Sequence, residues 1–396
     1  RQLRLLLPGL SGLAATLANA WPAGLVWTAA VINMFGAANN INGWISPIPV
    51  PMPVRSAALF PSDPPATVDW RVDEILKEAE RRADPADAVA NLSLVANDFR
   101  FNLPLFTWRS KALNLEKTHP RPVNERLSEL SQFVVLKTGS LGPPGMTTNL
   151  PEAASAIKKT DGWFARGYER VAQFVLPDGG EAWLFGLRKP KEAPFKAKGP
   201  TKFQYYQTGP FSATDFKVDI GAWDADRGVY RKVTAAAPTI ELRGLRLLDV
   251  AVEMRDVLVI PGGRPTKELE FDEVRFLKLG TLKVDSISLP SEAIKEYAKS
   301  RVKGLEISSL TLDGSARLEG SLHGFSIKME LTPRVVASPS AVVLDVKKLS
   351  IGPSNIPLAW LGPWKAITVP LEPNPETPFR VEIPGLTLKN DRLTVP

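Results

Sequence analysis

The stretch from Leu5 to Val54 contains no Asp, Glu, Lys, Arg or His. Its most apolar part, residues 21–38, covers roughly 27 Å as a helix, close to the ~30 Å hydrocarbon core of a bilayer. Trp21 and Trp44 flank this part, and indole rings favour the membrane interface. The sequence therefore predicts a membrane-spanning segment within residues 1–45.

Residues 5–20 allow three interpretations: the end of a preceding helix, the start of one long kinked helix, or a signal peptide that ends at Ala18-Asn19-Ala20. The chain begins with arginine, so we expect it to be part of a longer protein. One crossing with Arg1 and Arg4 inside places the rest of the chain outside the cytoplasm, whereas two crossings return it to the cytoplasm. We favour one crossing and an extracytoplasmic (periplasmic-side) location.

Composition narrows the classes of site. The 396 residues are enough for two further domains, and they include no cysteine, which excludes disulfides and thiolate metal sites. His119 and His323 are the only histidines, so an all-histidine metal site is not expected. The net charge of +7 is spread among interspersed acids and bases, without a basic-aromatic module. We expect no cofactor, no metal and no nucleic-acid partner.

Alternating prolines in residues 46–65 favour an extended stalk, because proline cannot continue a helix. Beyond the stalk, helical and strand patterns alternate, which predicts a small α/β sandwich over residues 66–190. The expected helices and strands cover residues 70–82, 88–96, 104–113, 133–136, 152–158, 168–176 and 181–187.

Polar residues follow two of these strands. Asn97, Asp98, Lys137 and Thr138 could line a ligand site at the carboxyl edge of the sheet. Alternatively, they cap loops and form turns, which is the interpretation we favour. Residues 139–145 are glycine-rich but lack the pattern of a phosphate-binding loop, and no catalytic Ser/His/Asp motif is present.

Residues 1–190 resemble the C-terminal end of GT-C glycosyltransferases of the dolichyl-phosphate-mannose type. The resemblance lies in an apolar helix, a proline stalk, the segments VANDFRFN and FVVLKTG, and a closing hairpin. It implies a small domain on the outer face of a membrane enzyme whose catalytic acids lie far upstream. This chain has no recognisable catalytic site, so whether it belongs to an enzyme stays open.

Residues 188–202 (RKPKEAPFKAKGPTK) are rich in lysine, arginine and proline. They predict a basic linker, placed at residues 191–205. Such a run could rest on anionic lipid headgroups, at about 1 kcal/mol per charge. A solvated, extended linker is the simpler alternative, and we favour it.

From residue 206 to the end, apolar and polar residues alternate with period two, interrupted by one predicted helix from Pro290 to Lys303. Each strand should have one apolar face, and these faces should meet across a common interior. The residues expected to line this interior are Ile240, Leu242, Val250, Val252, Met254, Phe271, Leu282, Val284, Leu310, Leu312, Ile327, Met329, Val342, Leu344, Val346 and Trp360.

The order of these elements is similar to that of the LmeA-like phospholipid-binding family. The segments that carry the likeness are ELRGLRLLDVAVEMRDVLV, the helix SLPSEAIKEYAKSRVKG, LSIGPSNIPLAWLG and VEIPGLTLKNDRLTV. The resemblance implies a tubular lipid-binding fold, related to the TULIP domains, close to a membrane. It also implies no enzymatic residues, and a rim or lid in the segment around Trp360.

These observations predict an α+β chain with a transmembrane helix, an α/β sandwich and a tubular domain over residues 206–396. We expect a membrane-anchored lipid-binding module whose partners are the membrane, a phospholipid or polyprenyl lipid, and a membrane protein. The alternative is a structural or interaction domain of the cell envelope with a dry core.

Overall fold

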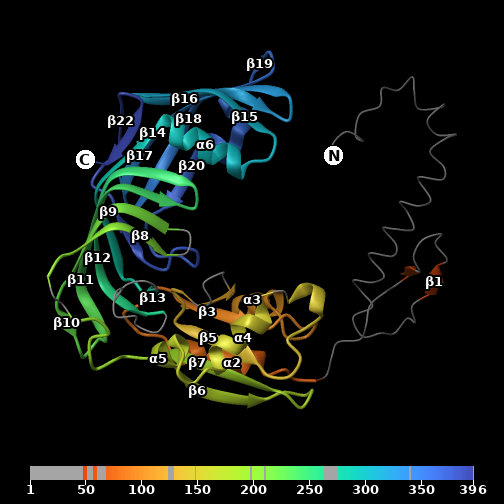
Figure 1. Ribbon diagram of the computed structural model, residues 1–396. Helices are drawn as coiled ribbons and strands as arrows, with labels where there is room; N and C mark the ends of the chain where they lie inside the picture. Colours follow the sequence, from red (N-terminus) through yellow and green to blue (C-terminus); the bar gives the residue numbers. More distant parts are fainter. Residues whose placement is uncertain are drawn as a thin grey trace. The chain divides into compact units, whose positions relative to one another are not determined.

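The protein is described by a computed structural model. The described residues are 48–50, 57–59, 68–123, 129–147, 149–196, 199–208, 211–262, 274–338 and 340–395. They fall into two units, residues 1–69 and residues 70–396 (Figure 1). The predicted membrane span and most of the predicted stalk lie outside the described residues. None of the helices in the described part combines the length and the hydrophobicity that crossing a bilayer requires.

In the first unit, β1 (Ile48–Val50) pairs antiparallel with β2 (Ala57–Leu59). The extended backbone expected of a proline-rich stalk is therefore present at β1. Its pairing with β2 was not predicted. In a two-stranded ribbon both strands are edges, so Pro49 can be accommodated although it has no N–H to donate.

The second unit begins with an α/β part (Figure 1). A five-stranded sheet in the order β4-β3-β5-β7-β6 has β3 parallel to β4 and β5, and β7 antiparallel to β5 and β6. Its elements are α2 (Val72–Arg82), β3 (Ala90–Val95), α3 (Leu103–Ala112), β4 (Thr118–Pro122), β5 (Phe133–Lys137), η2 (Pro144–Met146), α4 (Leu150–Lys158), α5 (Trp163–Gly167), β6 (Tyr168–Val175) and β7 (Glu181–Leu187).

The helices and strands predicted for this part are confirmed to within a few residues, and β4, η2 and α5 are additions. Every residue of β3 and β5 is buried, as expected for central strands covered on both faces. In α2, Glu78 and Arg82 form an i,i+4 ion pair at 2.6 Å. Asp73 of the same helix contacts Arg109 of α3.

Two long antiparallel hairpins dominate the rest of the unit and belong to a ten-stranded sheet. The main strand order is β22-β23-β14-β12-β11-β9-β8, with β10, β13 and β21 paired to β11, β12 and β14. The strands are β8 (Thr201–Thr208), β9 (Phe211–Ile220), β10 (Trp223–Asp224), β11 (Val229–Leu242), β12 (Leu245–Pro261), β13 (Val274–Lys278), β14 (Thr281–Pro290), β21 (Arg380–Glu382), β22 (Thr387–Lys389) and β23 (Arg392–Val395).

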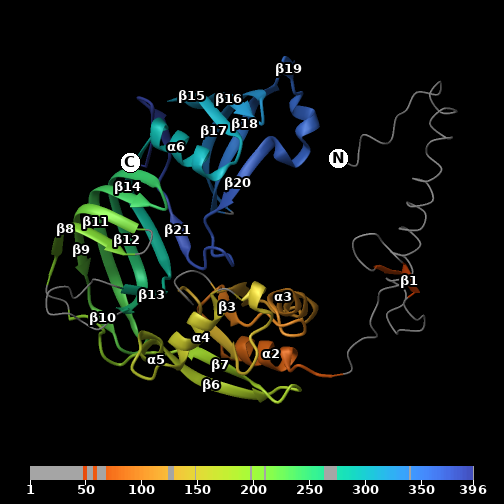
Figure 2. The same cartoon turned by 45° about the vertical axis from the view of Figure 1, so that its right-hand side comes forward.

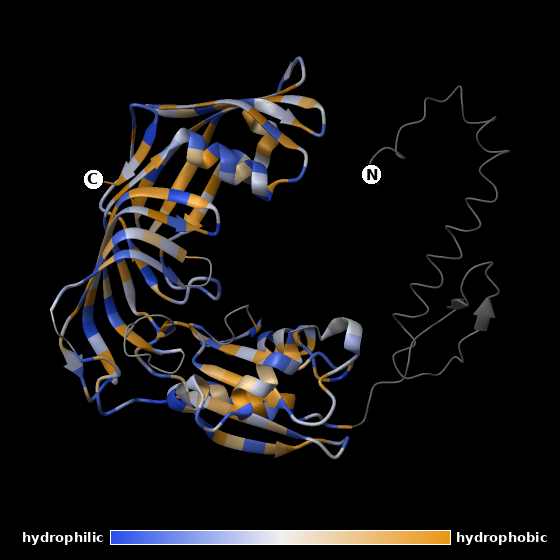
Figure 3. Ribbon diagram, in the orientation of Figure 1, coloured by the Kyte–Doolittle hydropathy of each residue, from blue (hydrophilic) through white to orange (hydrophobic). Residues whose placement is uncertain are grey.

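A second, six-stranded sheet has the order β15-β16-β17-β18-β19, with β20 paired to β18. Figure 3 shows alternating hydrophobic and hydrophilic bands along the strands of both large sheets, as the period-two pattern predicted. The elements are β15 (Leu305–Asp313), β16 (Ser315–Leu322), β17 (Phe325–Ala337), β18 (Ser340–Ile351), β19 (Ser354–Asn355), η3 (Leu358–Lys365) and β20 (Ala366–Pro370).

The predicted helix of the C-terminal half is α6 (Ser291–Arg301). It contacts β15 of one sheet and β12 and β14 of the other, so it lies where the two sheets meet (Figure 2). Pro290 is its N-cap, and no side chain caps the helix. Val302 follows the last turn and is 43% exposed.

The fold class of the described residues is a sheet-rich α+β arrangement, with mostly antiparallel large sheets and one mixed sheet. The α/β part is not an isolated body within this unit. Phe164 and Tyr168 from the α/β part share a hydrophobic cluster with Leu258 of β12 and Leu277 of β13. In addition, the backbone N–H of Leu130 donates a hydrogen bond to the carbonyl of Phe276 at 3.0 Å.

Candidate functional site

The ten-stranded sheet carries an apolar cavity of about 400 Å³ on one face. This volume lies within the range of small-molecule sites, about 300–1,000 Å³. Strands β8, β9, β11, β12 and β13 supply most of the lining. The lining residues are Glu129, Phe203, Tyr206, Phe211, Phe216, Val218, Ile220, Val233, Ala235, Ile240, Leu242, Arg243, Val252, Met254, Val257, Val259, Val274 and Phe276.

The cavity follows the strands lengthwise. On β11 its lining runs from Val233 to Leu242, which at about 3.3 Å per residue corresponds to roughly 30 Å of strand. Residues at one end are deeply buried, as Val257 is completely. At the other end Leu242 is 43% exposed. The cavity is therefore elongated and approaches solvent at the turn between β11 and β12.

A crease crosses this sheet and keeps its apolar side chains on one face. The strand registers place Pro238 of β11 between Asp215 of β9 and Asp249 of β12. Both aspartates have positive φ, 50° and 51°, and Pro238 has no N–H for the ladder. Because each strand is irregular here, the buried set changes from odd to even positions, as from Ala237 to Ile240.

Four aromatic rings from β8 and β9 form one wall of the cavity. The rings of Tyr206 and Phe216 are stacked with centroids 5.3 Å apart, and Phe203 lies 5.2 Å from Tyr206. Phe211 meets Phe216 edge to face at 5.6 Å. Such contacts add stability beyond the burial of area, so the wall is rigid and apolar.

Among the described lining residues, Glu129 and Arg243 carry a charge, and they lie at opposite ends. Glu129 Oε1 accepts a hydrogen bond of 3.2 Å from the backbone N–H of Phe276, at the β13 end. Arg243 is exposed in the turn between β11 and β12. The middle of the cavity is lined by uncharged side chains.

Seven of the predicted lining residues share the cavity-bearing face of the ten-stranded sheet. The register pairs Met254 with Leu282 and Val252 with Val284, which places β14 in line with β12. Four of the seven line the cavity directly, and Val250 is buried in the adjoining cluster. The seven residues are Ile240, Leu242, Val250, Val252, Met254, Leu282 and Val284.

Seven others share one face of the six-stranded sheet. Burial on this face falls along the sheet, from Leu312 at 2% exposed on β15 to Ile367 and Val369, which are exposed on β20. The register sets Ile367 beside Leu344 and Val369 beside Val342. These predicted residues, which do not line the 400 Å³ cavity, are Leu310, Leu312, Ile327, Met329, Val342, Leu344 and Val346.

The last two predicted residues lie elsewhere. Phe271 is outside the described residues. Trp360 lies in η3 and is 80% exposed, so it lines no interior. The expectation that the segment around Trp360 forms a rim or lid stays a prediction.

The aromatic wall was missed from the sequence. The linker was predicted to extend to residue 205, whereas β8 begins at Thr201. Phe195, also within the predicted linker, is buried against the sheet rather than solvated. The sequence did contain a signal for the β9 part of this wall, because apolar residues alternate with polar ones along the strand. The pattern shifts by one residue at Asp215, and the apolar residues are Phe211, Ala213, Phe216, Val218 and Ile220.

The polar residues after the α/β strands form loop contacts. The amine of Lys137 is fully buried and donates to Asp178 at 2.6 Å and to the Ser140 carbonyl at 2.8 Å. Thr138 Oγ1 accepts from the backbone N–H of Glu181 at 2.8 Å. These contacts agree with the turn-and-capping interpretation of this cluster.

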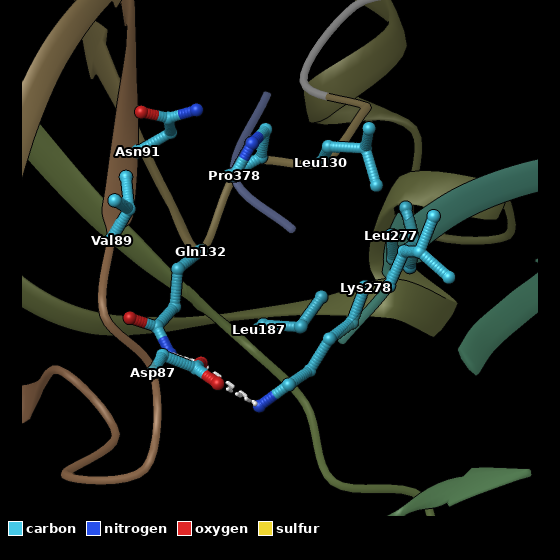
Figure 4. Close-up of a pocket in the computed structure, with 10 residues that line it drawn as sticks. Asp87, Val89, Asn91, Leu130, Gln132, Leu187, Leu277, Lys278 and Pro378 are labelled. Atoms are coloured by element: carbon cyan, nitrogen blue, oxygen red, sulfur yellow. Dashed lines mark hydrogen bonds and ion pairs between the residues drawn. The ribbon is translucent and has the colours of Figure 1, made fainter. Parts of the chain in front are cut away.

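A second, much smaller cavity of about 30 Å³ lies where the α/β part meets β13 (Figure 4). There the Asp87 carboxylate accepts hydrogen bonds from Lys278 at 2.8 Å and from Gln132 at 2.9 Å. Asn91 donates to the Pro375 carbonyl at 2.9 Å. A volume of this size holds a water molecule or two, and its polar groups join chain segments.

A third hollow, of about 570 Å³, adjoins this junction and is lined by acids and bases together. Its charges are already paired: Lys189 lies 3.4 Å from Asp84, and Arg188 lies 3.7 Å from Glu169. Paired, largely exposed charges indicate a solvated surface. Across the described chain, no group of three or more Asp, Glu or His side chains is arranged to hold a metal ion.

Comparison with protein-family models, with curated proteins and with solved structures finds no match to this chain. The apolar cavity of the ten-stranded sheet is therefore the feature from which a function can be argued.

Proposed function

We propose that this chain is a membrane-associated lipid-binding module that holds a hydrocarbon chain in the cavity of the ten-stranded sheet. The observation that carries the proposal is the elongated 400 Å³ cavity. Glu129 lies at one end of it and Arg243 at the other, and the described side chains that line it between these two ends are uncharged. A flexible hydrocarbon chain matches such a cavity in both shape and polarity.

The energetics favour this kind of ligand. Each buried methylene is worth about 0.8 kcal/mol, so a chain of a dozen methylenes gains about 10 kcal/mol before the cost of ordering. The aromatic wall and the branched side chains of β11 and β12 provide dispersion contacts without requiring a polar partner. A charged anchor is therefore not required for retention.

The finer description of the fold is part of the same proposal. The apolar faces of the ten-stranded and six-stranded sheets, with α6 where they meet, would form a tubular module of the kind implied by the LmeA-like resemblance. The half-exposed face that reaches Ile367 and Val369 would extend the apolar path beyond the cavity. A phospholipid or a polyprenyl lipid fits this description.

The proposed partner surface is a bilayer. Phe325, Ile351, Leu358 and Trp360 are exposed apolar side chains near the β18–η3 end of the six-stranded sheet. Exposed Lys347, Lys348 and Lys365 occur in the same elements. Apolar side chains with flanking lysines suit an anionic membrane surface.

The sequence resemblance extends the proposal to a role beside a GT-C glycosyltransferase, outside the cytoplasm. In that role the module would hold the lipid of a lipid-linked sugar for the membrane part of the enzyme. A structural domain with a dry core remains the competing function, and the two differ in whether the cavity retains lipid.

The test uses the full chain, because the α/β part shares a core with β12 and β13. Lipid bound to the purified chain is extracted after gel filtration and quantified by mass spectrometry. Ala235→Trp places a bulky apolar side chain in the cavity lining and should lower retained lipid severalfold. Ala236→Trp makes the same change on the opposite face of β11 and should retain lipid as the original chain does.

Circular dichroism and thermal unfolding are measured on both variants to check that each one folds. If the unsubstituted protein carries no lipid and takes up no added fatty acid, the proposed function is wrong. Equal retention by the Ala235→Trp and Ala236→Trp variants would show that any bound lipid lies elsewhere.

A further inference from the structure

The exposed end of the cavity is formed by a tight turn that contains Arg243. Leu242 and Leu245 are paired, so Arg243 and Gly244 are the two residues of a hairpin loop. Their φ values are 53° and 84°, the left-handed conformation that such loops require. Arginine has no local advantage in this conformation, which costs a residue with a Cβ about 1 kcal/mol. Its side chain nevertheless lines the cavity.

A second arginine lies beside this turn. Arg301, the last residue of α6, has its Nη2 atom 3.4 Å from the backbone carbonyl of Arg243. The Arg301 guanidinium lies 5.1 Å from the centre of the Tyr297 ring, which helps to hold it in place. The C-terminal end of a helix also favours a cation at this position.

Within the described part of the chain, no carboxylate lies at ion-pair distance from Arg243 or Arg301. Three other arginines of the sheet are paired with carboxylates: Arg231 with Asp224 at 3.2 Å, Arg255 with Glu253 at 2.7 Å and Arg380 with Glu372 at 2.9 Å. At the buried end of the cavity the charged residue is an acid, Glu129. Two arginines, Arg243 and Arg301, therefore lie at the exposed end of the cavity, and a glutamate lies at the other end.

Resting on the proposed function, we propose that the ligand is an amphiphile with an anionic head group, a carboxylate or a phosphate, bound by Arg243 and Arg301. The hydrocarbon tail of the ligand enters the cavity first and points toward Val257 and Val259. The head group stays at the exposed end. Guanidinium groups donate paired hydrogen bonds to either kind of head. A neutral amphiphile of the same length gains the apolar contacts without this contribution.

The experiment compares the binding of three amphiphiles with sixteen-carbon tails to the full-length protein: hexadecanoate, hexadecyl phosphate and hexadecanol. The protein is incubated with an equimolar mixture, separated from unbound amphiphile by gel filtration and extracted. The bound amphiphiles are then quantified by mass spectrometry. We expect each anionic amphiphile to be retained about fivefold over hexadecanol, the gain of a partly exposed ion pair. The preference should fall as salt is added.

In the Arg243→Gln/Arg301→Gln variant the ratio should fall to about two or below, with hexadecanol retained as before. The control is Arg246→Gln, which removes one positive charge three residues from Arg243. Arg246 is opposite Glu241 in the register and so lies on the other face of the hairpin. This variant should keep the original ratio.

The possible outcomes separate the two proposals. Retention of all three amphiphiles at equal levels, or a ratio that the double variant leaves unchanged, overturns the assignment of the head group but leaves the cavity as a hydrocarbon site. Retention of none by the original chain overturns the proposed function, and this inference with it. Preference for hexadecyl phosphate over hexadecanoate points to a phosphorylated lipid, and the reverse points to a fatty acid.

Discussion

The Tyr230 hydroxyl forms two hydrogen bonds with the backbone of Phe195: it accepts from the N–H at 2.7 Å and donates to the carbonyl at 2.8 Å. Tyr230 lies at the start of β11 and is 1% exposed. A single phenol thus satisfies both backbone polar groups of a buried residue in the segment that leads into β8. This contact holds that segment against the sheet that bears the cavity.

We expect Tyr230→Phe to lower the free energy of unfolding by about 1–3 kcal/mol, because two buried backbone groups lose their partner. Tyr205→Phe is the control, since that hydroxyl is on an exposed ring and bonds Gln207. It should change stability by less than about 0.5 kcal/mol. Urea unfolding followed by circular dichroism measures both, and equal effects of the two changes would contradict the assigned role.

The same contact predicts a pH dependence. Burial raises the pKa of Tyr230, against a smaller opposing effect of the Phe195 N–H. The folded protein therefore holds the phenol proton more tightly than the unfolded chain. The protonated phenol therefore contributes to the free energy of unfolding. This stabilising contribution is fully present below the pKa of tyrosine in the unfolded chain, about 10, and is lost as the pH rises through the higher pKa of the folded protein. The stability difference between the original chain and Tyr230→Phe should shrink above about pH 10, measured by urea unfolding across that range.

The buried ion pair of Lys137 and Asp178 gives a prediction for the α/β part. Lys137→Met leaves the Asp178 carboxylate without its partner and should cost about 2–4 kcal/mol, a value reduced because Asp178 is one-third exposed. The Lys137→Met/Asp178→Asn double variant should regain part of this loss. Thermal unfolding measures each variant.

Lys189→Met is the control for this pair, because Lys189 is exposed and its contact with Asp84 is 3.4 Å long. It should cost less than about 1 kcal/mol. A similar loss in both single variants would mean that burial of Lys137 has no special importance for the hairpin turn.

Most elements of the α/β part could be predicted from the sequence, because the spacing of apolar residues within each element is enough to identify it as a helix or a strand. The apolar stripe of α2 and the apolar run of residues 133–136 in β5 are examples. The predicted linker shows the opposite case. β8 is the outermost strand beside β9 and carries Lys202 and other polar residues, as edge strands commonly do. Composition therefore indicated a linker where pairing with β9 makes a strand.

The site was only partly predictable for a different reason. Alternation identifies one apolar face on each strand, but it does not indicate which faces enclose a cavity. Met254 and Met329 carry the same signal, yet one lines the 400 Å³ cavity and the other lies on the face of the six-stranded sheet. The crease at Pro238 also shifts the period by one residue, so a strict period-two pattern places later residues on the wrong face.

This crease can be tested at Asp249, whose φ is 51°. Asp249→Asn should be tolerated, because asparagine adopts this conformation readily. Asp249→Val should cost about 1–2 kcal/mol, since a β-branched residue is strained there. Relief of that strain by flattening the crease would move inner side chains outward. We therefore expect less retained lipid in Asp249→Val than in Asp249→Asn, and equal retention would mean that the crease does not shape the cavity.

The proposed membrane-facing end of the six-stranded sheet can be tested with single labels, because the chain has no cysteine of its own. Trp360→Cys, labelled with an environment-sensitive fluorophore in the full chain reconstituted in anionic nanodiscs, should show a blue-shifted emission that spin-labelled lipids quench. The physical reason is transfer of an exposed apolar position into the interface. Phe99→Cys is the matched control, since Phe99 is 82% exposed but lies in the α/β part. Its label should keep the emission of an aqueous site. Equal quenching at both positions, or none at Trp360→Cys, would remove the basis for docking through η3.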